Sequence, residues 1–162
     1  MSFQEIERKF LLQSLPDGVS ETEPIHFERY YLFASQNIEL RVQQKGELFE
    51  FERKVQHKEN NLVRESYKIP ISQEEFDLFK QQAIGNKIVF KKYKLPDSAF
   101  TVKEYEACLK GLILLELEFG NLDEATSFQP LEWMGKDISM SPFSRDSGLV
   151  NVNSLREISF EN

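Results

Sequence analysis

The sequence has little that would suit an oxidising compartment, a membrane or a nucleic acid. Cys108 is the lone cysteine of 162 residues, so no internal disulfide can form and a reducing compartment fits. No apolar run reaches the length of a membrane span, and charged residues precede the first apolar run, unlike a signal peptide. The net charge of −7 disfavours a broad basic surface for nucleic acid. We therefore expect a cytoplasmic protein with no membrane and no nucleic-acid partner.

Several common catalytic motifs are also missing. The glycines form no phosphate-binding loop of the P-loop or Rossmann type, and there is no nucleophile-elbow motif. His26 and His57 are far apart in the sequence and lack the spacing of zinc ligands. We therefore expect surface or hydrogen-bonding roles for the two histidines rather than zinc binding or general-base catalysis.

What the sequence does contain is a series of short segments in which polar and apolar residues alternate, the period of a β-strand. One longer helix is expected to be capped by Ser72 and to end at Gly85. The expected strands cover residues 5–12, 25–33, 38–43, 48–55, 62–71, 87–95, 100–109 and 112–119; short helices are expected at 121–128 and 132–135, and 149–160 is either a strand or a short helix. This pattern predicts one domain over residues 1–162, of α+β class but mainly β: a closed or nearly closed eight-stranded antiparallel β-barrel with a few flanking helices.

The polar residues of these strands share one parity, so each strand has one polar face. Examples are Glu39/Arg41/Gln43, Glu50/Glu52/Lys54, Arg64/Ser66/Lys68 and Glu116/Glu118. The pattern cannot decide which face points into the barrel, and by itself it favours charges in water.

The first expected strand places Glu5, Glu7 and Lys9 on one face. A divalent cation would relieve the repulsion between the two glutamates, and an anionic ligand would pair with Lys9. The alternative is a solvated edge strand.

The segment at residues 5–10, EIERKF, resembles the N-terminal ExExK signature of the CYTH superfamily, the triphosphate tunnel metalloenzymes. Further matches follow in the family's order: Arg41, Lys54, Arg64 and the late ExE strand with Glu116 and Glu118. The superfamily includes inorganic triphosphatases, thiamine triphosphatases, class IV adenylyl cyclases and fungal-type RNA triphosphatases. The resemblance implies a tunnel whose inner wall is polar.

The resemblance also implies roles for individual residues and an activity. Metal ligands would be Glu5, Glu7, Glu116 and Glu118; phosphate-binding residues would be Lys9, Arg41, Lys54, Arg64 and Lys92; and the catalytic set would be Glu5, Glu7 and Lys9. The implied activity is hydrolysis of inorganic triphosphate, or of a triphosphorylated small molecule, with Mg²⁺ or Mn²⁺. The alternatives are a non-catalytic module that binds polyphosphate or nucleotide and, less favoured, a class IV adenylyl cyclase.

The sequence departs from the family pattern at several positions, and most of the departures remove a carboxylate. Gln43 stands where a second basic residue is usual, and Phe90 where a lysine is usual, although Lys92 could serve from the same face. Ser66, Lys68, Thr101 and Lys103 stand at positions where carboxylates are expected, and Arg29 adds a positive charge. We therefore expect a more cationic lumen with one metal cluster, in which anion binding survives better than catalysis.

Overall fold

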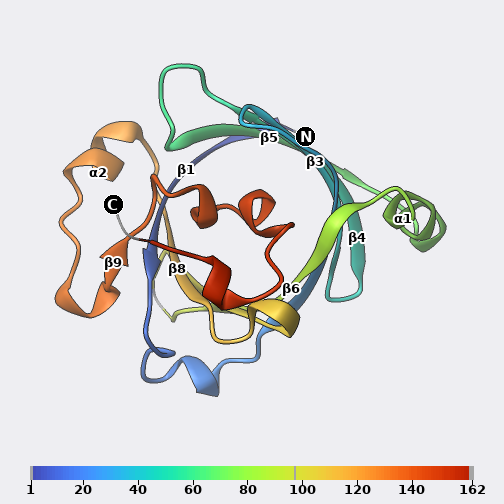
Figure 1. Cartoon of the computed structure of the whole chain (residues 1–162). Coiled ribbons are helices and arrows are strands. Elements are labelled where there is room, and N and C mark those ends of the chain that lie inside the picture. Colours follow the sequence, from blue (N-terminus) through green and yellow to red (C-terminus); the bar gives the residue numbers. More distant parts are fainter. Residues whose placement is uncertain (1, 97, 161–162) are drawn as a thin grey trace.

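The computed structural model describes residues 2–96 and 98–160, and over these residues eight antiparallel strands form a closed barrel (Figure 1). The order of neighbouring strands is β5-β4-β3-β2-β6-β7-β8-β1, and pairing of β1 with β5 closes the ring. The strands are β1 (Ser2–Leu11), β2 (Ile25–Ala34), β3 (Ile38–Lys45), β4 (Leu48–Gln56), β5 (Val63–Pro70), β6 (Ile84–Lys94), β7 (Phe100–Tyr105) and β8 (Ile113–Glu118). The predicted barrel is confirmed.

Consecutive hairpins join β2 to β5, and the helix α1 (Gln73–Lys80) then carries the chain outside the barrel to β6, which pairs with β2. The ring of Phe76 in α1 lies 5.0 Å from that of Phe49, and the rings of Phe79 and Phe51 are 5.8 Å apart. The apolar parity of β4 therefore faces outward, beneath the helix.

The same inversion holds on the other side of the barrel. Phe10, Val102, Leu115 and Leu117 form an outer core with Met134, which lies in the 3-10 helix η3 (Glu132–Met134). The helix α2 (Leu122–Ser127) and the short strand β9 (Lys136–Asp137), which pairs with β1, lie on this side. Because apolar side chains are covered on the outside, the polar parity lines the lumen, and the assignment favoured by the pattern alone is wrong.

The C-terminal part of the chain closes one end of the barrel (Figure 1). Leu149, Val150 and Val152 pack against lumen-facing apolar residues such as Tyr31 and Leu114. The cavity in the lumen is therefore blocked at this end and extends towards the opposite end of the strands.

Three expected boundaries differ in the structure. The helix capped by Ser72 ends at Lys80, and Gly85 lies in β6 instead. The strand expected over 100–109 ends at Tyr105, because residues Ala107–Leu109 form a 3-10 turn. The segment 149–160 holds a 3-10 helix, η6 (Leu155–Glu157), and no strand among its described residues. No helix of the described chain has both the length and the apolar character needed to cross a membrane.

Candidate active site

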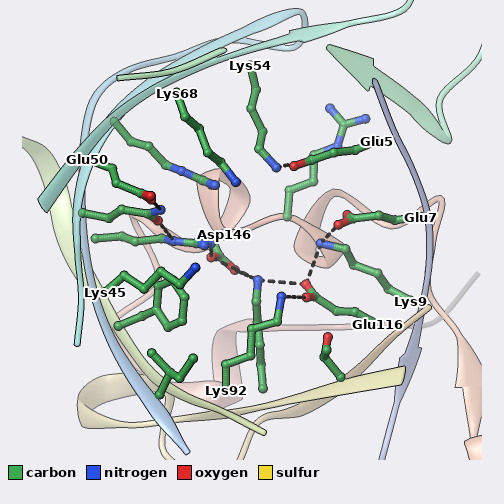
Figure 2. A pocket seen from close by; sticks show the side chains of 18 of the residues that line it. Glu5, Glu7, Lys9, Lys45, Glu50, Lys54, Lys68, Lys92, Glu116 and Asp146 are labelled. Carbon is green, nitrogen blue, oxygen red and sulfur yellow. Dashed lines mark hydrogen bonds and ion pairs between the residues drawn. The ribbon is translucent and has the colours of Figure 1, made fainter. Parts of the chain in front are cut away.

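The barrel lumen encloses a cavity of about 290 Å³ with a strongly charged wall (Figure 2). Eleven lysines and arginines line it, against six aspartates and glutamates, although the whole chain carries a net charge of −7. The lumen of this acidic protein is therefore basic, as the resemblance implied. The predicted site residues that line this cavity are Glu5, Glu7, Lys9, Arg41, Lys54, Arg64, Lys92 and Glu116.

The β1 wall presents Glu5, Glu7 and Lys9 to the lumen, as alternation along the strand requires (Figure 2). Glu5 accepts a hydrogen bond from the ammonium of Lys54. The carboxylate of Glu7 lies 3.5 Å from the Lys9 Nζ and 3.3 Å from a guanidinium nitrogen of Arg64. Burial alone would raise the pKa of Glu7, but these cations outweigh it and hold the pKa well below its usual range.

Glu116, on β8, is shared by three lysines. Its carboxylate oxygens lie 3.1 Å from Lys9 Nζ, 3.0 Å from Lys92 Nζ and 2.8 Å from Lys103 Nζ. Burial opposes ionisation, but Lys103, Lys9 and Lys92 together hold the pKa of Glu116 well below its usual range. Through these three ion pairs, Glu116 connects β8 to β1, β6 and β7.

Glu118 lies next to this cluster but does not line the cavity. It is exposed, and its Cα is the cross-strand partner of Glu7. Partial burial raises the pKa of Glu118, and the negative charges of Glu7 and Glu5 raise it further. Carboxylates that disfavour one another's charge are the oxygen donors that a hard divalent cation neutralises.

The acidic residues are not already gathered around an ion position. Within residues 2–96 and 98–160, no three Asp, Glu, His or Cys side chains converge as a metal site. Glu5, Glu7 and Glu116 are each held by a lysine or arginine instead. The donor set fits Mg²⁺ or Mn²⁺ in chemistry, and an ion would have to take the place of those ammonium and guanidinium partners.

On the opposite wall, Arg41 is tied to a carboxylate that sequence reasoning did not single out. Its Nε and Nη2 donate to Glu52 at 2.9 and 2.5 Å, and its Nη1 donates to the Tyr31 hydroxyl at 3.0 Å. Ser66 donates to the other oxygen of Glu52 at 2.6 Å, and Lys68 is the cross-strand partner of Glu52. Glu52 therefore supplies on β4 the negative charge that was expected at positions 66 and 68 of β5.

Asp146 plays the same part at the closed end of the cavity. The 3-10 helix η5 (Asp146–Leu149) in the C-terminal segment delivers it, and its side chain is 1% exposed. It accepts hydrogen bonds from Arg29 and from the Tyr105 hydroxyl, the latter at 2.5 Å. Lys103 Nζ lies 3.4 Å away, and burial lowers the pKa of this lysine to about 8. Asp146 follows no strand periodicity, so no pattern in the sequence singled it out.

Gln43 and Arg145 complete the wall. Gln43 accepts a hydrogen bond from Arg29 Nε at 2.6 Å and donates one to Glu50 at 2.7 Å, so it organises charged neighbours without adding a charge. Arg145 lines the closed end and donates to Gln56.

No family model matches the sequence. An inorganic triphosphatase from Nitrosomonas europaea is 33% identical to the chain over 138 residues, which cover 83% of this chain and 89% of the relative. A crystal structure of an inorganic triphosphatase matches with a TM-score of 0.64 at 28% identity, covering 91% of this chain and 94% of that one. A putative adenylate cyclase from Bacillus halodurans matches with a TM-score of 0.57 at 15% identity, covering 77% and 85% of the two chains, and this likeness concerns the fold alone.

Proposed function

The chain belongs to the CYTH superfamily of triphosphate tunnel enzymes, and we propose that it hydrolyses inorganic triphosphate or a triphosphorylated small molecule inside its barrel. The single observation that supports this proposal best is the lumen, where lysines and arginines outnumber carboxylates almost two to one in an acidic protein. Such a lumen attracts a compact polyanion, and its depth shields the reacting phosphorus from bulk water.

We assign phosphate binding to Lys9, Lys54, Arg64 and Lys92, each of which now pairs with a carboxylate. A bound triphosphate would replace those carboxylates as the partner of each cation, with Arg64 able to contact two oxygens at once. Arg41 belongs to the same set, but its three nitrogens are engaged by Glu52 and Tyr31. A guanidinium carries five N–H donors, so two of those of Arg41 remain for a phosphate oxygen in the cavity that it lines.

We assign the divalent ion, Mg²⁺ or Mn²⁺, to Glu5, Glu7, Glu116 and Glu118. When bound, the ion would supply charge neutralisation at the phosphate oxygens and make a coordinated water more acidic. Lys9 Nζ lies between Glu7 and Glu116, where it would keep both carboxylates in position and would also reach a phosphate oxygen bound in the cavity. We assign the catalytic set to Glu5, Glu7 and Lys9, whose spacing is fixed by the pleat of one strand.

The expected partner is a free triphosphate or polyphosphate rather than a macromolecule, because the basic groups lie inside the barrel. We place the protein in the cytoplasm, where the free thiol of Cys108 would stay reduced.

Phosphate release from tripolyphosphate, measured with and without Mg²⁺ or Mn²⁺, tests the proposal. We expect metal-dependent release, and a loss of at least about 100-fold in kcat/KM for Glu5→Gln and Glu116→Gln, since even outer-shell partners of metal ligands are worth about 10–100-fold. Glu65→Gln is the matched control, because Glu65 lies on β5 but is exposed on the outer side.

Two other outcomes would replace the proposal. Tight binding of tripolyphosphate without any metal-dependent release would identify a non-catalytic binding module. Conversion of ATP to cyclic AMP and pyrophosphate would identify an adenylyl cyclase.

A further inference from the structure

Lys103 is a buried lysine that connects two carboxylates from distant parts of the chain. Its Nζ lies 2.8 Å from Glu116 Oε1 on β8 and 3.4 Å from Asp146 Oδ2 on the C-terminal segment. The side chains of all three residues are at most 5% exposed, and all three line the cavity. The ammonium therefore stands where oxygen atoms from two separate elements converge.

An ordinary ion pair would not need this arrangement. Glu116 already has Lys9 and Lys92, and Asp146 already has Arg29 and the Tyr105 hydroxyl. Lys103 adds one further cation that both carboxylates share, and it lies closer to Glu116 than Lys9 or Lys92 does, at the cost of burying its own charge. Its particular feature is its place between the two carboxylates, as a divalent ion would bridge them in a two-metal phosphoryl-transfer site.

We propose that the Lys103 ammonium is a built-in cation that takes the place of a second divalent ion between Glu116 and Asp146. This inference rests on the proposed triphosphatase function and refines it: the enzyme needs one exchangeable metal ion, and Lys103 supplies the fixed positive charge at the closed end of the cavity. A tethered cation cannot be lost by dilution or chelation, so this half of the charge neutralisation does not depend on the concentration of metal ion.

The test is to remove the ammonium and count the metal ions that bind. Lys103→Ala leaves Glu116 and Asp146 facing an open space, and we expect it to bind one more Mn²⁺ per chain than the wild type. The measurement is Mn²⁺ titration without substrate, followed by electron paramagnetic resonance of the free ion. If the alanine variant does not fold, the same titration is carried out on Lys103→Gln. This variant keeps most of the side-chain volume and offers an amide oxygen as a ligand.

Two controls make the expected gain specific. Lys92→Ala removes a different lysine from Glu116 without opening a position next to Asp146, so the number of bound ions should not rise. The double variant Lys103→Ala/Asp146→Asn should lose the extra ion, because one of its two carboxylates is gone.

A folded Lys103 variant with the wild-type number of Mn²⁺ ions would overturn the proposal, as would an extra ion that survives Asp146→Asn. Either result would leave Lys103 as a structural ion pair. The titration contains no triphosphate, so it is independent of whether the wild type releases phosphate from tripolyphosphate. Failure of the triphosphatase proposal would appear only in the phosphate-release assay, and failure of the Lys103 proposal only in the Mn²⁺ titration.

Discussion

At the scale of single residues, the lumen is stabilised by ion pairs in which both charges are removed from water. Glu52 is 0% exposed, and it holds Arg41 through two hydrogen bonds at 2.9 and 2.5 Å. Burying two charges costs several kcal/mol per ion, so such a pair contributes little net stability, but removal of one partner leaves the other charge buried and unpaired.

We therefore predict that Glu52→Gln lowers the free energy of unfolding by about 3 kcal/mol, near the lower end for breaking a buried pair, because the amide still accepts one hydrogen bond. Urea denaturation measures the change. The double variant Arg41→Met/Glu52→Leu, which removes both charges and keeps apolar volume, should lose less than the single variant. A single-variant loss below about 0.5 kcal/mol would mean that water reaches Arg41.

The residues that sequence reasoning missed are those whose partners are set by register or by the C-terminal segment. The alternation of Glu50, Glu52 and Lys54 was visible in the sequence. The contact between Glu52 and Arg41, however, depends on which residues of β3 and β4 lie opposite each other. Asp146 comes from a segment without periodicity, and only the folded chain brings it to Lys103. Their assignment needed tertiary structure.

At the scale of elements, the strands were predictable because alternation over six to ten residues is a strong local signal. Helix ends were less so. Gly85 was interpreted as a helix terminus, since glycine with positive φ is common there. The structure uses its φ of +62° in β6, where the register with β2 shifts and the backbone approaches Val150. The ability of glycine to adopt a positive φ is therefore used for a tertiary contact here, and not for ending a helix.

This contact makes Gly85 one of the points where the C-terminal segment is fixed to the barrel. The amide of Asn86 donates to the Val150 carbonyl at 2.6 Å, and a Cβ on Gly85 would lie 2.5 Å from that carbonyl oxygen. A side chain at this position must therefore push the segment that carries Asp146 away from the end of the barrel.

We predict that Gly85→Ala destabilises the protein by about 2–5 kcal/mol, the sum of a positive-φ cost of about 1–2 and an overpacking cost of about 1–3 kcal/mol. Gly18→Ala is the matched control, because Gly18 also has positive φ, at +80°, but nothing lies within 4 Å of its Cβ position. It should show the φ cost alone. Urea denaturation of both variants, with limited proteolysis of the C-terminal segment, measures the difference; equal losses would contradict a clash with Val150.

At the scale of the whole molecule, the barrel separates charge of opposite sign. The chain carries a net charge of −7, yet the lumen has an excess of lysine and arginine. The exterior therefore carries more negative charge than the total indicates, and an anion is attracted only where the basic lumen opens. The resemblance to the tunnel family predicted this inside-out arrangement, which alternation alone could not decide.

The buried lumen also predicts how stability depends on pH. Despite burial, neighbouring cations hold the pKa of Glu7, Glu52, Glu116 and Asp146 below the usual range in the folded state. In the unfolded chain these groups titrate near pH 4. Below that pH the unfolded state binds more protons than the folded state, so acid favours unfolding. The stability that these groups contribute is present above about pH 5 and is lost progressively as the pH falls.

The measurement is the free energy of unfolding by urea at a series of pH values from 7 to about 3, and we expect it to fall steeply below about pH 5. Glu52→Gln removes one of the four carboxylates, so its profile should be shallower in this range by up to one proton. Glu65→Gln changes an exposed carboxylate and should keep the wild-type slope. Because the lumen pairs are shielded from solvent, added salt should alter the slope little. A profile that Glu52→Gln leaves unchanged would place the source of acid sensitivity outside the lumen.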